Sequence, residues 1–386
     1  MQEIKDRIIG ALRREGLDAL VTFGADNFAY VTGIVLPFPQ SFPERNAVAI
    51  VARDGSRSIV CPLEWRQVVE DQGWDGGLEA YDENDGLPPW SALDALGRAL
   101  VSLGLGKGTV GLDRQRTTAR VAQALAERWS GLAWQSGDDL LRELRQRKSA
   151  AEVARIEQAA READLGIIGA LNHMEGSLDG GGYTLSEFSE RTRVHAYEEG
   201  STGVGHVAAF TSATGSSAFA PQGPDKFVAG DLARVDITSH SFGYWANLSR
   251  MFVLGDPTAA QLAAHGLNLE LKALACDMLR PGRRCDDIFR EVAARAERAR
   301  AGLRTELGIG HGVGVSEREG PYLQAGDSTA LESGMVVALE VNTDGPRGEI
   351  IRSKDIYEIR SDGPRLLSWY RNWDRLYHVF GYRSAH

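Results

Sequence analysis

Cysteine is scarce in this sequence, and long apolar segments are absent from it. Only three cysteines occur in 386 residues (Cys61, Cys276 and Cys285), and none of them belongs to a CxxC pair. A disulfide framework or a structural zinc site is therefore not expected. The longest uninterrupted apolar run covers residues 47–52. A membrane-spanning helix needs roughly 18 apolar residues or more, so we expect no membrane association.

Positive charge is also in short supply. The chain has 43 Lys and Arg against 53 Asp and Glu, which gives a net charge of −10. A nucleic-acid-binding surface needs clustered basic residues, so nucleic acid is not expected as a partner. The first ten residues, MQEIKDRIIG, have neither the basic start nor the apolar stretch of a signal peptide, which indicates a cytoplasmic protein.

The first part of the chain alternates between helix and strand patterns. Apolar residues at helical spacing and short apolar runs bounded by turn residues are the signals for these elements. Asp54-Gly55, between two apolar runs, is typical of a β-hairpin turn. We therefore expect an α/β domain over residues 1–148. Helices are predicted over residues 4–15, 93–103 and 117–129, and strands over residues 17–23, 47–52, 58–61 and 110–112.

A second domain is expected over residues 149–386, beginning at a capping box. Ser149 and Glu152 have the spacing at which two side chains satisfy the free amides of a helix start, and Thr184 and Glu187 repeat that pattern. From about residue 207 onward the sequence becomes rich in strand patterns. Strands are predicted over residues 232–237, 251–254, 335–341 and 356–359, and helices over residues 150–170 and 259–278.

Four polar residues stand within or at the ends of apolar, strand-like runs of the second domain. They are Asp236, Asn247, His311 and Glu340. A polar group is costly to bury without a partner, so each of these side chains must find one. Any one of them alone would be explained by a cap or a satisfied core residue. Four of them in one domain indicate a functional site, because buried ionisable groups gather where a site is built.

Six segments in order resemble the creatinase/prolidase/aminopeptidase P superfamily. The resemblance implies a creatinase-like N-terminal α/β domain, a C-terminal pita-bread domain and a homodimer. The segments are GLDALVTFGADNFAYVTG (16–33), RQRKSAAEVARIEQAA (145–160), GDLARVDITSHSFGYWANLSRMF (230–252), GIGHGVGVSEREGP (308–321), LESGMVVALEV (331–341) and SKDIYEIRSDGPRLLS (353–368).

The resemblance also implies where metal ligands would stand. Metallopeptidases of this superfamily hold two divalent ions with two Asp, one His and two Glu. Asp236, His311 and Glu340 match three of these positions, whereas Asn247 replaces the second Asp and Lys354 replaces the last Glu. A protonated amine does not ligate a metal and repels one nearby. We therefore expect no metal and no cofactor, with Lys354 in the metal's place neutralising Asp236 and Glu340. The alternative is a single weakly held ion with Lys354 turned away.

Two further histidines of the superfamily's peptidases are missing, since their positions hold Phe219 and Arg318. A proline-specific peptidase is therefore not expected. Creatinase is the superfamily's metal-free branch, and Arg318-Glu319 resembles its Arg-Glu pair. The resemblance makes Arg318 the expected anchor of a substrate carboxylate. Phe219, Asp236 and Asn247 complete the expected substrate-binding set.

Four side chains are candidates for moving protons: His311, Glu319, Glu340 and Lys354. His311 is the preferred one, because a neutral imidazole can accept and donate a proton near pH 7. Lys354 is the alternative, as an acid or through a Schiff base, if burial lowers its pKa. Aromatic residues recur every four residues in the tail, at Trp369, Trp373 and Tyr377, and this spacing predicts a helical stripe packed on a core or subunit face.

These features predict a metal-independent, creatinase-like hydrolase. Its substrate would be a small charged metabolite that contains nitrogen and can carry a carboxylate, and the bond cleaved would be a C–N bond of the amide, amidine or urea type. Two alternatives stay open. One is a lyase, cyclase or rearrangement enzyme on the same fold, and the other is a non-catalytic binding protein with a degenerate metallopeptidase site.

Overall fold

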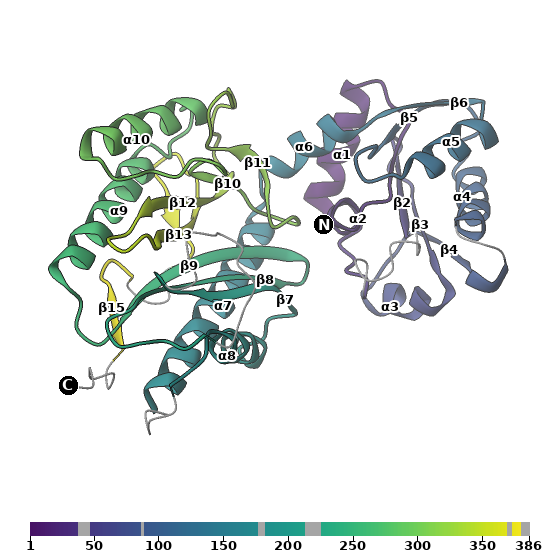
Figure 1. Cartoon of the computed structure of the whole chain (residues 1–386). Helices are drawn as coiled ribbons and strands as arrows, with labels where there is room; N and C mark the ends of the chain where they lie inside the picture. Colours follow the sequence, from purple (N-terminus) through teal and green to yellow (C-terminus); the bar gives the residue numbers. More distant parts are fainter. Residues whose placement is uncertain (38–46, 86–88, 177–181, 213–224, 369–372, 380–386) are drawn as a thin grey trace. The chain divides into compact units, whose positions relative to one another are not determined.

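The computed structural model describes residues 1–37, 47–85, 89–176, 182–212, 225–368 and 373–379. The chain forms two compact units, Met1–Arg145 and Gln146–His386 (Figure 1). The first unit is an α/β domain with a mixed sheet, and the second is built on a mainly antiparallel sheet. This two-domain architecture confirms the fold class expected from the sequence.

The first unit contains a six-stranded sheet in the order β4-β3-β2-β1-β5-β6. The predicted hairpin is present, because β2 and β3 pair antiparallel, and Gly55 in the turn has a φ of 96°, which a residue with a side chain rarely adopts. The strands are β1 (Ala19–Thr22), β2 (Val48–Ala52), β3 (Arg57–Pro62), β4 (Gly77–Tyr81), β5 (Gly108–Leu112) and β6 (Leu132–Ser136), and the helices are α1 (Gln2–Arg14), α2 (Ala25–Thr32), α3 (Arg66–Asp71), α4 (Trp90–Ser102), α5 (Ala119–Arg128) and α6 (Asp138–Gln146).

A buried carboxylate lies at the end of β5 in this unit. Asp113 has no exposed surface and accepts hydrogen bonds from the backbone N–H groups of Phe23 and Gly24 at 2.8–3.0 Å. The side-chain amide of Asn27 donates a further bond at 3.2 Å. Because Gly24 is the N-cap of α2, Asp113 satisfies donors at that helix start from another element of the fold.

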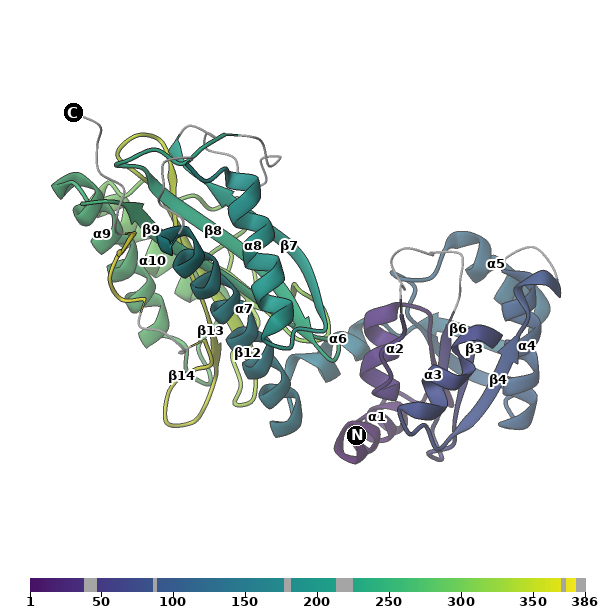
Figure 2. The same cartoon turned by 90° about the horizontal axis from the view of Figure 1, so that it is seen from below.

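The second unit contains a sheet in the order β11-β10-β12-β13-β9-β8-β7 (Figure 1). Short strands extend it, with β14 antiparallel to β13 and β15 parallel to β9. Helices α7 and α8 pack on β7–β9, whereas α9 packs on β12 and β13 (Figure 2). The strands are β7 (Gly203–Phe210), β8 (Leu232–Ser241), β9 (Tyr244–Leu254), β10 (Gly310–Gly312), β11 (Glu319–Tyr322), β12 (Val336–Asp344), β13 (Ile350–Glu358), β14 (Arg365–Leu366) and β15 (Tyr377–Val379), and the helices are α7 (Ala150–Gly176), α8 (Leu185–Glu198), α9 (Ala259–Asp277) and α10 (Cys285–Ala299).

Both predicted capping boxes are present. The Ser149 amide donates to the Glu152 carboxylate at 2.8 Å, and the Glu152 amide donates to the Ser149 hydroxyl at 3.3 Å. Thr184 and Glu187 make the same reciprocal pair at the start of α8. These contacts explain why the two helices begin where the sequence predicts.

The predicted helical stripe of the aromatic tail is wrong for the part that the structure describes. Tyr377 begins the strand β15, which pairs with β9, so edge hydrogen bonding decides its conformation. Trp373 lies with its ring centroid 6.2 Å from that of Tyr377. Trp369 lies outside the described residues. Among the helices in the described ranges, none has the length and apolar character needed to cross a membrane.

Candidate functional site

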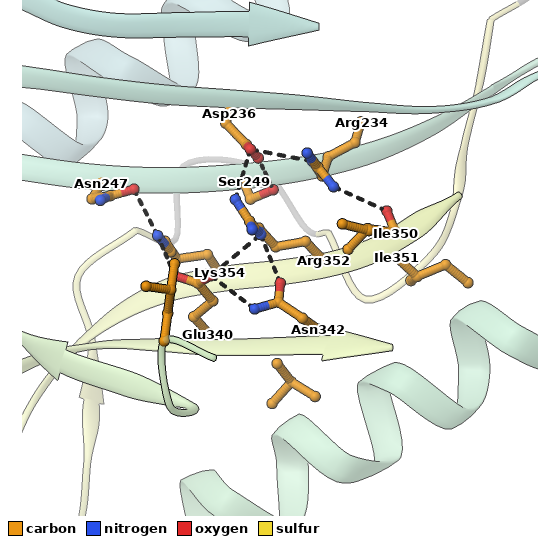
Figure 3. A network of polar contacts seen from close by, with 12 residues as sticks. Arg234, Asp236, Asn247, Ser249, Glu340, Asn342, Ile350, Ile351, Arg352 and Lys354 are labelled. Carbon is orange, nitrogen blue, oxygen red and sulfur yellow. Dashed lines mark hydrogen bonds and ion pairs between the residues drawn. The ribbon is translucent and has the colours of Figure 1, made fainter. Parts of the chain in front are cut away.

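Four long strands of the second unit bring the predicted polar residues together (Figure 3). Asp236 lies on β8, Asn247 on β9, Glu340 on β12 and Lys354 on β13. Glu340 stands directly opposite Lys354 in the β12–β13 ladder, and Ser249 stands opposite both Asp236 and Lys354. All of these side chains are buried. Strand pairing across more than a hundred residues of sequence therefore assembles one polar cluster in an apolar interior.

The Lys354 ammonium lies between an amide and a carboxylate. Its Nζ donates to Asn247 Oδ1 at 2.9 Å and forms an ion pair with Glu340 Oε2. Burial lowers the pKa of Lys354, although the facing Glu340 carboxylate opposes that effect. Burial alone would raise the pKa of Glu340, but Lys354 and Arg352 outweigh it and hold that pKa well below its ordinary value. Glu340 is therefore ionised near pH 7, and its charge favours the protonated form of Lys354.

Asp236 is neutralised by two arginines that the sequence analysis did not include. Arg352 Nη1 donates to its Oδ2 at 2.8 Å, and Arg234 Nε lies 3.2 Å from the same oxygen. The Ser249 hydroxyl donates to Oδ1. The expectation that Lys354 bonds both carboxylates is thus wrong for Asp236. Since side chains two apart in a strand share a face, Arg234 beside Asp236 was the available signal.

Arg352 links the two carboxylates of the cluster. Besides Asp236, its guanidinium contacts Glu340, with Nε 3.3 Å from Oε1, and donates from Nε to Asn342 Oδ1 at 2.6 Å. Asn342 in turn donates from Nδ2 to Glu340 Oε1 at 2.9 Å. We call the set Arg234, Asp236, Asn247, Ser249, Glu340, Asn342, Arg352 and Lys354 the central network (Figure 3).

His311 lies on β10, opposite Ala338 of β12, and is almost fully buried. Its Nδ1 lies 3.0 Å from the carbonyl oxygen of Gly312. A carbonyl can only accept, so Nδ1 carries the proton and Nε2 is left with its lone pair. Burial, Lys354 and Arg318 lower the pKa of His311 to about 3. The ring is therefore neutral at pH 7, and this environment favours accepting a hydrogen bond over holding a second proton.

Arg318 and Glu319 lie in different environments. Glu319 is buried and accepts from Lys148 Nζ at 2.7 Å, so its charge is already balanced. Arg318 is half-buried, donates to the Leu307 carbonyl, and has its guanidinium carbon 5.6 Å from the ring centroid of Tyr322. The geometry makes Glu319 a structural partner of Lys148. Phe219, the remaining predicted substrate contact, lies outside the described residues.

A second ionic cluster lies on the face of β13 opposite to Lys354. Asp355, next to Lys354, accepts from Arg250 Nη1 at 2.8 Å and is also paired with Lys272. Arg250 Nη1 additionally donates to the Lys354 carbonyl at 2.8 Å, and its Nε donates to Asp164 at 2.9 Å. These bonds position the backbone of β13, and therefore Lys354. A pocket of about 670 Å³ opens beside this cluster, not at the central network, and Lys272, Cys276, Tyr357 and Trp373 are among its lining residues.

The two divalent ions implied by the resemblance do not fit the residues present. Both carboxylates of the central network are engaged by cations, and Lys354 stands where a ligand would be needed. Asn247 is a neutral and weaker oxygen donor than the Asp it replaces. Within the described ranges, no group of three or more His, Cys, Asp or Glu side chains is arranged to hold a metal ion. We therefore derive no chemistry through a bound metal.

Comparisons with known proteins agree with this architecture. The creatinase/prolidase N-terminal domain matches residues 5–147, and metallopeptidase family M24 matches residues 150–361. A putative dipeptidase from Bacillus subtilis is 23% identical over 94% of this chain and 97% of its own length. An Xaa-Pro dipeptidase from Pyrococcus horikoshii is 23% identical over 95% of this chain and 97% of its own length.

Solved structures show the same fold at low sequence identity. An X-Pro aminopeptidase from Thermotoga maritima superposes with a TM-score of 0.82 at 17% identity, covering 97% of this chain and 99% of that one. The N-terminal domain of the chickpea FACT complex subunit SPT16 superposes with a TM-score of 0.73 at 15% identity, covering 96% and 97%. The two family matches together cover nearly the whole chain. The chain thus belongs to metallopeptidase family M24, a family of hydrolases, and carries a creatinase/prolidase N-terminal domain.

Proposed function

We propose that this protein hydrolyses a C–N bond of the amide, amidine or urea type in a small, charged, nitrogen-containing metabolite, without a metal ion. One observation carries the proposal: the Lys354 ammonium is hydrogen-bonded to Asn247 and paired with Glu340 at a position that matches a metal ligand of the family. A fixed positive charge in a buried site can stabilise a developing oxyanion, which is one task that a metal performs in hydrolysis.

Lys354 has a donor to spare for this task. An ammonium group carries three N–H bonds, and the described residues use two of them, toward Asn247 and Glu340. The third is available to the oxygen of the scissile group. In hydrolysis, the water oxygen bonds to the carbon, the C–N bond breaks, and the leaving nitrogen takes up the proton that the water releases. His311 is neutral, and its Nε2 lone pair can accept a hydrogen bond from the attacking water.

Metal content and chelator resistance test the proposal most directly. Protein purified without added metal is expected to contain far less than one ion per chain by elemental analysis. Turnover, sought among small zwitterions and amides, should be unchanged by a strong chelator. Lys354→Met should abolish turnover, whereas substitution of the exposed Lys107 should not change it. Activity that requires added manganese or cobalt would refute the proposal.

Product analysis separates hydrolysis from elimination, cyclisation or rearrangement. In heavy-oxygen water, a hydrolase leaves solvent oxygen in its product, whereas the other reactions do not. Xaa-Pro dipeptides serve as comparison substrates because relatives are named as Xaa-Pro dipeptidases. Metal-stimulated turnover of such dipeptides would show that this chain is a peptidase.

A non-catalytic binding role is the second candidate. It is favoured by the ion pairs of the central network, in which cations of the protein itself engage both Asp236 and Glu340. Such a network can be wholly structural. Saturable binding of a small zwitterion without any product, at enzyme concentrations near that of the ligand, would favour this reading.

A further inference from the structure

Basic side chains outnumber carboxylates in the central network. Three cations, Arg234, Arg352 and Lys354, face two carboxylates, Asp236 and Glu340. Lys354 and Arg352 both contact Glu340, and Arg352 and Arg234 converge on the same oxygen of Asp236. Each carboxylate is therefore shared between two basic side chains.

Arg234 is the basic side chain of this network that has donors without a hydrogen-bond partner among the described residues. This side chain is 2% exposed, and its Nη1 donates to the Ile350 carbonyl at 3.4 Å, which is a long bond (Figure 3). Of the described residues, none accepts a hydrogen bond from its Nε or Nη2, although Nε lies 3.2 Å from Asp236 Oδ2. Nε and Nη2 form one edge of the guanidinium group, the edge with which an arginine grips a carboxylate through two parallel bonds.

Leaving such an edge unbonded is costly. A buried donor without an acceptor loses its hydration with no replacement. The ring of Phe210 covers one face of the guanidinium, with its centroid 4.1 Å from Cζ, and offers only a weak cation–π contact. Among the described residues, no carboxylate therefore bonds both Nε and Nη2 of this edge.

We propose that Arg234, supported by Arg352, forms an anion-binding subsite of the central network, and that its ligand is a small carboxylate. A carboxylate would complete the free edge of Arg234 and would balance the charge, since two guanidinium groups would then face Asp236 and the ligand together. Binding in the plane of the guanidinium leaves the Phe210 contact in place.

Two sources can supply that group: the carboxylate of the substrate or a free carboxylate ion. The subsite itself does not depend on enzymatic activity, whereas its use for the substrate rests on the proposed function. If the substrate carboxylate binds here, Arg318 is not its anchor, because that side chain is half-buried and donates to the Leu307 carbonyl. Arg234 would then restrict the substrates to those with a compact carboxylate.

The test uses sodium formate, the smallest carboxylate, with the full-length protein. Thermal unfolding is followed as formate is added, with sodium chloride at equal ionic strength as the reference. Formate should raise the unfolding temperature in a saturable way that chloride does not reproduce. Arg234→Met should weaken the apparent formate affinity at least tenfold. Arg360→Met removes an exposed arginine elsewhere in the same unit, and it should leave the formate response unchanged.

Arg234→Met is expected to fold, because Asp236 keeps Arg352 and Ser249 as partners. Arg234→Lys retains the charge but not the two-donor edge, so its formate affinity should also fall, which keeps the test valid if the methionine variant does not fold. A formate response that chloride matches, or that survives in both variants, would overturn the subsite.

Inhibition kinetics identify the source of the carboxylate. Competitive inhibition by formate would support binding of the substrate carboxylate at Arg234. Non-competitive inhibition would overturn that assignment, but it would remain compatible with the subsite itself. Formate binding in a protein without any turnover would reject the hydrolase and keep the subsite. Turnover without a formate response would reject the subsite and keep the hydrolase.

Discussion

Buried carboxylates occur in both units, and the two units stabilise them by different means. In the N-terminal unit, Asp113 is held by neutral donors, namely two backbone N–H groups and two side chains, Asn27 and Thr117. Burial raises the pKa of Asp113 to about 6 despite these hydrogen bonds. In the C-terminal unit, Asp355 and Glu340 face Arg250, Lys272, Arg352 and Lys354, and both pKa values are lowered.

The difference shows what a buried carboxylate needs in order to remain ionised. Hydrogen bonds from neutral donors do not offset the loss of hydration at Asp113, whereas facing cations more than offset it at Glu340. The ionised carboxylates of the C-terminal unit therefore depend on charge pairs, and removing one partner leaves a buried charge without its counterion. The N-terminal unit contains a carboxylate, Asp113, whose protonated form is stabilised by folding, because its pKa is raised to about 6. This contrast predicts opposite responses to mutation and pH.

The largest effect is expected from Lys354→Met. The change leaves Glu340 with Arg352 and the Asn342 amide as partners, and it removes the hydrogen bond to Asn247. Removing one partner of a buried ion pair lowers the free energy of unfolding by about 3–5 kcal/mol. Urea denaturation, followed by a probe in the C-terminal unit, measures the loss. The exposed Lys107 provides the matched control, and Lys107→Met should change stability by less than about 0.5 kcal/mol. Equal effects of the two variants would contradict a buried pair.

The second prediction concerns the ionic cluster behind β13. Asp355→Asn leaves Arg250 and Lys272 without their shared carboxylate and should cost about 3–5 kcal/mol at pH 7. Because the folded pKa of Asp355 is lowered, its stabilisation is present above the unfolded pKa of about 3.9 and is lost as pH falls below that value. The variant should therefore lose less stability than the native protein between pH 5 and pH 3. A parallel pH dependence in both proteins would argue against the assignment.

The third prediction has the opposite sign and belongs to Asp113. Its pKa of about 6 lies above the unfolded value, so the unfolded chain releases this proton first as pH rises. The N-terminal unit should lose stability between about pH 4 and pH 6, by up to about 3 kcal/mol. Hydrogen exchange of amides in β5 and α2, measured across this range, reports the change. Asp113→Asn should abolish the dependence, whereas substitution of the exposed Asp82 should leave it intact.

The smallest effect is expected at the start of α7. Ser149→Ala removes the hydroxyl that accepts from the Glu152 amide and should cost about 1 kcal/mol. Glu152→Gln keeps an oxygen acceptor for the Ser149 amide and should cost less. Chemical denaturation of both variants checks the order, and a larger loss for Glu152→Gln would show that the charge of Glu152 matters more than the cap.

Local patterns predicted much of the fold. Apolar spacing predicted α1, α4, α5 and α9, and the capping boxes predicted the starts of α7 and α8, because both signals act within a few residues of chain. The tail failed for the complementary reason. Tyr377 has helical spacing to its aromatic neighbours, but pairing with β9, distant in sequence, makes it part of a strand.

The candidate site was predictable in its members but not in its bonds. Polar residues in apolar strands, together with the family resemblance, identified Asp236, Asn247, Glu340 and Lys354, and the structure brings them together. Arg234 and Arg352 were missed, because a strand pattern shows which residues share a face but not how far each side chain reaches. Lys148 was missed because its partner, Glu319, lies 171 residues away.

The sequence by itself determined that two domains form and where most helices begin. It also determined that the site combines carboxylates and an amide with a lysine. Only the tertiary structure decided which cation neutralises which carboxylate, and that the Nε–Nη2 edge of Arg234 has no hydrogen-bond acceptor among the described residues. The reason is physical. Burial patterns along a strand repeat every two residues, whereas charge pairing depends on the register between β8, β9, β12 and β13, which long-range backbone hydrogen bonds set.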